Sequence, residues 1–139
     1  SLQVRMLLAG PVIPAGKKIE ELVEYVDIYP TLASLAGIES PNNQLEGASM
    51  LPLLKNENVE WKKQVVSKYQ DGLSIKTKDF LYSEWSSSDT AIYALMLYNH
   101  SSDPDENVNI AEEEENKALV ETLKKDLIKY RGKDFNLRE

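Results

Sequence analysis

The first part of the chain consists of short apolar runs separated by loops that contain proline and glycine. The run Val4–Gly10 is apolar and ends at a Gly-Pro pair, a pattern typical of a buried β-strand. Residues 11–18 contain two prolines and a glycine, which indicates a loop. Because prolines interrupt the apolar residues, this stretch is too short to cross a membrane.

Two helices are predicted further along this part of the chain. The first covers 28–36, because Pro30 is tolerated in a first helical turn and Gly37 suits the left-handed conformation that often follows a helix. Asp27 is then the predicted N-cap residue. The apolar positions of this helix fall on one predicted face: Ile28, Leu32, Leu35 and Ala36. A shorter helix is predicted over 49–55, with a serine as its cap and a proline in its first turn.

The second part of the chain changes to the period of a β-strand near residue 61. Lys63–Gln70 is followed by Asp71-Gly72, a strong tight-turn signal, and further runs up to Tyr98 predict a meander of about four antiparallel strands. A last helix is predicted over 114–131, because acidic residues lead it and basic residues close it. Its apolar positions form one stripe: Leu119, Leu123, Leu127 and Tyr130. The predicted fold class is α+β, an antiparallel sheet packed with a C-terminal helix.

Composition removes several kinds of site from consideration. The 139 residues carry a formal net charge of -7, so nucleic acid is an unfavourable partner. The absence of cysteine excludes disulfides, thiolate metal sites and cysteine nucleophiles. His100 is the only histidine, which excludes a histidine-cluster metal site. A nucleophile, a base and an orienting residue cannot be assembled from this set, so we expect no catalytic residue in the chain.

One polar segment has the spacing of a cation-binding loop. Its oxygen-bearing side chains are Asp103, Asp105, Glu106, Asn107 and Asn109. The segment lacks the glycine and the final glutamate of the known calcium-binding loop. We therefore interpret it as a turn that leads into the last helix, and we expect no bound metal.

Two further features are candidates for ligand binding. Lys76 lies in the sequence near Tyr82 and Trp85, and a cation beside aromatic rings can bind an anionic sugar. The alternative is a half-solvated sheet edge that lysines protect from aggregation. His100 follows an asparagine in a predicted turn, where it is either an ordinary surface residue or a hydrogen-bond donor to a ligand.

Four segments, in this order, resemble the C-terminal region of type I sulfatases, which are members of the alkaline-phosphatase-like superfamily. They are VDIYPTLASLAGI, LEGASMLPLLK, GLSIKTKDFLYSEW and LYNHSSDPDENVNIA. The Ser-Ile-Lys-Thr and Tyr-x-x-Trp elements are most similar to the iduronate-2-sulfatase branch. The residues that match the family's structural motifs are Asp27, Pro30 and Thr31 at a helix start, and Asp103, Pro104, Glu106 and Asn109 in a closing turn.

The resemblance implies a larger parent enzyme. Such sulfatases hydrolyse sulfate esters with a formylglycine, made within a Cys/Ser-x-Pro-x-Arg motif, and with a calcium ion, both in an N-terminal domain. This sequence lacks that motif. The resemblance therefore implies an inactive C-terminal fragment without a cofactor of its own, whose partners are the missing catalytic domain and, in the parent, a sulfated sugar. The opening Ser1-Leu2 fits an excised piece, and such enzymes are commonly exported, periplasmic or lysosomal.

On this resemblance, residues 1–56 are the tail of the catalytic α/β domain, and their strand and helix join its large sheet. Residues 57–139 are the C-terminal sulfatase subdomain. The candidates for one wall of the substrate cleft are Lys76, Trp85 and His100. Without neighbouring strands, the apolar run near the N-terminus needs another partner, so we predict self-association through 4–9. Two alternatives stay open: a phosphodiesterase or phosphonate hydrolase of the same superfamily, and a free-standing interaction module.

Overall fold

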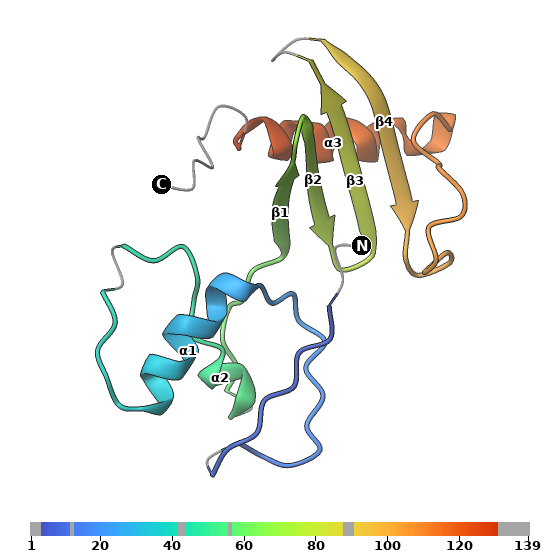
Figure 1. Cartoon of the computed structure of the whole chain (residues 1–139). Helices are drawn as coiled ribbons and strands as arrows, with labels where there is room; N and C mark the ends of the chain where they lie inside the picture. The colour runs from blue at the N-terminus through green and yellow to red at the C-terminus, as the bar shows by residue number, and fades with distance from the viewer. Residues whose placement is uncertain (1–3, 12, 42–43, 56, 88–90, 131–139) are drawn as a thin grey trace. The chain divides into compact units, whose positions relative to one another are not determined.

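The structure is a computed structural model of the 139-residue chain. It describes residues 4–11, 13–41, 44–55, 57–87 and 91–130. Two compact units make up the chain, Ser1–Lys63 (unit 1) and Gln64–Glu139 (unit 2). Figure 1 shows the helices of unit 1 and the sheet with its helix in unit 2.

Unit 1 is built around a short helical segment. A 3-10 turn, η1 (Tyr25–Asp27), runs directly into helix α1 (Ile28–Leu35), and a single-turn helix, α2 (Leu51–Leu54), follows after a loop. Both predicted helices of this part are therefore confirmed. At the end of α1, Gly37 has φ +68°. The backbone N–H groups of Gly37 and Ile38 donate to carbonyls of the last turn at 3.2 and 2.9 Å, so the predicted left-handed glycine belongs to a Schellman motif.

Two expectations for unit 1 are wrong. The described residues of unit 1 include no strand, and Val4 and Leu7 are 63% and 96% exposed. A strand forms only where a neighbour accepts its backbone hydrogen bonds, and the described part of this unit offers none. The buried side of α1 also differs from the predicted face. It consists of Pro30, Thr31 and Ala33, because the helix is fixed by hydrogen bonds of its first turn rather than by large apolar side chains.

Unit 2 contains the predicted antiparallel meander. The strands are β1 (Gln64–Tyr69), β2 (Gly72–Thr77), β3 (Phe80–Ser86) and β4 (Ile92–Asn99), and they pair in the order β1-β2-β3-β4. The predicted tight turn is displaced by one residue. Tyr69 pairs with Gly72, so Gln70 and Asp71 form the turn, and Gln70 takes the left-handed conformation at φ 53°.

Helix α3 (Lys117–Ile128), preceded by the 3-10 turn η2 (Glu114–Asn116), lies across one face of the sheet (Figure 1). The core between them consists of Leu73, Ile75, Tyr82, Leu97, Ala111, Val120, Leu123 and Leu127. Leu119 and Tyr130 pack against the edge of this core, which confirms the predicted stripe. Burial of each large apolar side chain contributes about 1.5–3 kcal/mol, so the sheet and helix form the better-packed unit of the chain.

Candidate functional site

Asp27 is fully buried and joins separate segments of unit 1. Its carboxylate accepts hydrogen bonds from the backbone N–H of Glu24 at 2.8 Å and of Ala48 at 2.9 Å. Asp27 is the N-cap residue of α1, as predicted, but its side chain makes no capping hydrogen bond to that helix. The carboxylate instead turns back to η1 and across to the loop before α2, where it accepts from two backbone donors in part-buried hydrogen bonds.

Lys62 lies beside this carboxylate and balances its charge. Its Nζ atom is 2.9 Å from both Asp27 oxygens and 2.8 Å from Glu24 Oε2. Burial lowers the pKa of Lys62, but the hydrogen bonds and charges of Asp27 and Glu24 outweigh that effect, and the pKa rises above its ordinary value. Sequence reasoning missed this lysine, because it is 35 residues from Asp27 and no local pattern links the two.

Thr31 and Pro30 complete the helix-start motif. The Thr31 hydroxyl is buried, donates to the Asp27 carbonyl at 2.6 Å and accepts from the Met50 N–H at 2.9 Å. Pro30 is buried in the first turn of α1, where no hydrogen bond from its nitrogen is needed. The motif therefore ties η1 and α1 to the start of α2, and its contacts are structural.

Asp103 holds the closing turn of unit 2. Its carboxylate accepts from the Val108 N–H and from the Asn107 side-chain amide, both at 2.9 Å. These donors, the Val108 N–H first among them, lower the pKa of Asp103. Each oxygen of Asp103 therefore accepts a hydrogen bond from within the closing turn.

Asn109 ties the same turn to the sheet. Its side-chain oxygen accepts from the N–H groups of Leu97 at 2.9 Å and Ala111 at 3.1 Å, and its amide donates to the Leu95 carbonyl at 3.0 Å. One side chain thus replaces the missing strand partner along this edge of β4.

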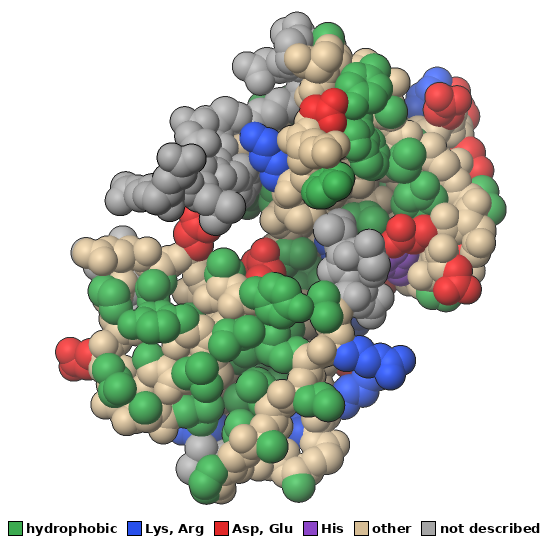
Figure 2. Space-filling model, viewed as in Figure 1, with side chains coloured by type: hydrophobic (Ala, Val, Ile, Leu, Met, Phe, Trp, Pro, Cys, Tyr) green, Lys and Arg blue, Asp and Glu red, His purple; other side chains and the backbone are tan. Residues whose placement is uncertain are grey.

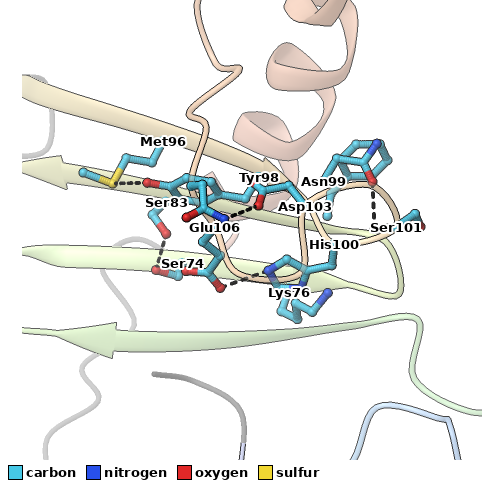
Figure 3. A network of polar contacts seen from close by, with 12 residues as sticks. Ser74, Lys76, Ser83, Met96, Tyr98, Asn99, His100, Ser101, Asp103 and Glu106 are labelled. Carbon is cyan, nitrogen blue, oxygen red and sulfur yellow. Dashed lines mark hydrogen bonds and ion pairs between the residues drawn. The ribbon is translucent and has the colours of Figure 1, made fainter.

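Lys76, His100 and Glu106 lie together at the end of the sheet where the closing turn begins (Figure 3). The His100 Nε2 and Glu106 Oε1 atoms are 2.9 Å apart, and Glu106 has the left-handed φ of 58°. The backbone N–H of His100 donates to the backbone carbonyl of Asp79 at 2.7 Å, which places His100 beside the β2–β3 turn. Burial lowers the pKa of Lys76, and the carboxylates of Asp79 and Glu106 oppose the shift. This end of the sheet brings together two of the three predicted binding residues.

Trp85 stands at the opposite end of the sheet. Lys76 pairs with Leu81 and Trp85 pairs with Gly72, so Lys76 and Trp85 lie on the same sheet face, away from α3. Trp85 is separated from Leu81 by about 13 Å along β3 at the usual rise of a strand. Between the two ends, the hydroxyl oxygens of Ser74 and Ser83, which pair across β2 and β3, are 2.7 Å apart (Figure 3). Lys76 and Trp85 therefore share a face of the sheet but lie at opposite ends of it.

Within the described ranges, no group of three or more His, Cys, Asp or Glu side chains is placed to hold a metal ion. The helices of those same ranges include none with the length and apolar character needed to cross a bilayer.

The family described as N-sulphoglucosamine sulphohydrolase, C-terminal, matches residues 1–133. The chain belongs to this family. Arylsulfatase K of Homo sapiens is 35% identical over 126 residues, which cover 80% of this chain and 23% of the relative.

Solved sulfatase structures share the fold. BT1596, a 2-O GAG sulfatase, is 26% identical, has a TM-score of 0.73, and aligns over 88% of this chain and 28% of its own. BT4656, solved in complex with its substrate D-glucosamine-2-N,6-O-disulfate, is 26% identical with a TM-score of 0.60 over 81% of this chain and 25% of its own. The chain thus spans 23–28% of the length of these relatives.

Membership of this C-terminal sulfatase family confirms the resemblance drawn from the four sequence segments and the α+β fold class. The finer likeness to the iduronate-2-sulfatase branch receives no support from the relatives named above. The described residues do not fit the calcium site that the family implies, because they include no cluster of three or more carboxylate or histidine side chains placed to hold a metal ion.

Proposed function

We propose that this chain is the C-terminal part of an enzyme that hydrolyses sulfate esters of a sulfated sugar. The observation that carries the proposal is the family match over residues 1–133, supported by relatives whose names are those of sulfatases. The chain has one histidine and no cysteine, so it supplies no nucleophile and is inactive alone. The formylglycine and the calcium ion belong, on this proposal, to the remainder of a longer protein.

The role of this chain in that enzyme is to form one wall of the substrate cleft. Lys76 offers a cation and His100 an imidazole at the same end of the sheet, and both suit the anionic and hydroxyl groups of a sulfated sugar. Trp85 offers an apolar ring on the same face. Residues 1–56 would complete the catalytic domain, and residues 57–139 would form the subdomain that selects the sugar.

The test uses the longer enzyme with single substitutions of the wall residues. Lys76→Ala should lower kcat/KM for a sulfated disaccharide by roughly tenfold or more, because a hydrogen bond to a charged group contributes about 1.5–3 kcal/mol. Hydrolysis of a simple aryl sulfate, which lacks the sugar, should change little. Lys68→Ala, on the exposed edge strand, is the matched control. If Lys76→Ala, Trp85→Ala and His100→Ala all leave the preference among sugars unchanged, this role is wrong.

Two finer hypotheses accompany the proposal. Assignment to the iduronate-2-sulfatase branch would be tested by comparing 2-sulfated iduronate with 6-sulfated glucosamine as substrates of the longer enzyme. Self-association through 4–9 is motivated by the exposed Val4 and Leu7 side chains. Sedimentation of the 139-residue chain should then show an assembly that Leu7→Asp disperses, and a monomer at all concentrations would dismiss it.

A further inference from the structure

Three aromatic side chains gather at the end of the sheet that carries the β1–β2 turn. Tyr69 and Tyr93 are 75% and 61% exposed, and Trp85 is half-buried. Figure 2 shows hydrophobic side chains beside an acidic one over this end of unit 2. Aromatic rings left open to solvent in one place are typical of binding surfaces, because they offer large rigid contact area.

A glycine sets the shape of this surface. Tyr69, Gly72 and Trp85 form one cross-strand row on the face away from α3. A Cβ atom at Gly72 would lie 2.8 Å from Trp85 Nε1 and 3.1 Å from Cε2. The indole therefore lies over Gly72, in the space that a side chain at this position would fill. The row is an open aromatic platform, defined here as Tyr69, Gly72 and Trp85.

One carboxylate belongs to the turn that joins Tyr69 to Gly72. Asp71 lies in the turn directly before Gly72, and its carboxylate accepts a hydrogen bond from the Tyr93 hydroxyl. Its backbone carbonyl accepts from the Ser86 N–H at 3.1 Å, which fixes the turn against the end of β3. A carboxylate accepts hydrogen bonds from sugar hydroxyls and repels a sulfate group. The chemistry of this end therefore differs from that of the end with Lys76.

We propose that the aromatic platform and Asp71 form a subsite for a neutral, unsulfated sugar ring. The ring would stack on Trp85 and Tyr69 and donate a hydroxyl hydrogen bond to Asp71. The platform is about 13 Å from the Lys76 end along the strands, so a single sugar cannot reach both. The assignment of this sugar ring to the enzyme's own substrate rests on the proposed function. If the ring is part of that substrate, the substrate is a glycan chain rather than a monosaccharide.

The subsite is tested on the 139-residue chain, without any enzyme activity. The probe is the unsulfated tetramer of N-acetylglucosamine, followed by shifts of the Trp85 indole N–H and the Tyr69 amide in NMR spectra. Tyr69→Ala should weaken binding about three- to tenfold, the usual range for one aromatic contact. Gly72→Ala should weaken it similarly, because the added Cβ displaces the indole. Tyr29→Ala in unit 1, which removes a 58% exposed tyrosine, is the matched control and should change nothing.

Three results would overturn the subsite. The first is that the tetramer leaves the NMR signals of Trp85 and Tyr69 unmoved. The second is that the Tyr69→Ala variant binds the tetramer as tightly as the unchanged chain. The third is that a 6-sulfated tetramer binds this end of the sheet more tightly than the neutral one. Tyr69 is mostly exposed on an edge strand, so its loss leaves the fold intact and keeps the test valid if Trp85 variants fail to fold. A longer enzyme without sulfatase activity would refute the proposed function and leave this binding result untouched.

Discussion

Replacing Asp27 by alanine should unfold unit 1 more readily than any change at its surface. The carboxylate is fully buried and receives the backbone N–H groups of Glu24 and Ala48 together with the ammonium of Lys62. Alanine removes the acceptor for all three donors at once. The two backbone groups belong to η1 and to the loop before α2, and both of their hydrogen bonds are part-buried.

The magnitude follows from the number of donors left without a partner. A buried N–H that loses its acceptor costs about 1–3 kcal/mol, and the two part-buried donors here fall toward the lower end of that range. Lys62 is 20% exposed and keeps Glu24, so its own loss adds at most about 1 kcal/mol. We expect Asp27→Ala to lower the free energy of unfolding of unit 1 by about 3–5 kcal/mol. Asp27→Asn keeps one acceptor oxygen and should cost about half as much.

The assay needs a signal from unit 1 alone. The Trp61 indole N–H donates to the Leu22 carbonyl at 2.7 Å, so its fluorescence reports the fold of unit 1. Denaturant titrations in a Trp85→Phe background isolate this signal from unit 2. The control is Lys18→Met, which breaks the surface ion pair with Glu20 and should cost under about 0.5 kcal/mol. A loss below about 1 kcal/mol for Asp27→Ala would refute the reasoning, because the orphaned donors would then find partners elsewhere.

The same cluster sets a pH dependence. The pKa of Lys62 is raised in the folded state relative to an ordinary lysine at about 10.4. The stability that its charge contributes is therefore fully present below that ordinary value, and it declines as the pH rises through the raised folded pKa. Lys62→Met should remove this alkaline decline. A decline of the same size in that variant would assign it to other groups.

Three further predictions concern single contacts. Gly47→Ala should destabilise unit 1 by about 1–3 kcal/mol, because the new Cβ would overlap the backbone carbonyl of Val26. Denaturation followed by Trp61 fluorescence measures this loss, and an unchanged midpoint would contradict it. Leu127→Ala, at a fully buried site of α3, should cost about 2–5 kcal/mol by thermal unfolding, whereas Ile128→Ala, which is half exposed next to it, should cost far less. The hydrogen bond to Asp71 raises the pKa of the Tyr93 phenol. Asp71→Asn should therefore lower the pKa of Tyr93 in an ultraviolet titration. An unchanged titration curve would show that Asp71 does not cause the raised pKa.

Local patterns were enough to predict the helices and the meander. The glycine after α1, the alternation of β1–β4 and the stripe of α3 each depend on residues close in sequence, and the structure confirms them. The displaced turn has a tertiary cause. Gly72 was expected in the turn, but the structure places it in β2 because the Trp85 indole covers it. A glycine that is needed for a close approach looks the same in sequence as one that is needed for a turn.

Long-range partners could not be predicted. The sequence placed Asp27 correctly at a helix start, but its hydrogen-bond partners come from residues up to 35 positions away. In the same way, Lys76, Trp85 and His100 were grouped by residue type. Strand register then separates Trp85 from the other two. The run Val4–Gly10 shows the opposite failure, since its strand pattern depends on a neighbour that the described chain does not supply.

The two units are stabilised by different kinds of interaction. Unit 2 buries a continuous apolar layer between its sheet and α3. In unit 1, the buried apolar residues are few and mostly on or beside α2, while Tyr29 and Leu32 of α1 are 58% and 53% exposed. The contacts that fix α1 are therefore mainly those of Asp27 and Thr31. A polar network of this kind specifies one geometry, but it contributes little to the free energy of unfolding when some of its donors or acceptors lack a partner. This is why one lost acceptor in unit 1 should have an effect as large as a cavity in the core of unit 2.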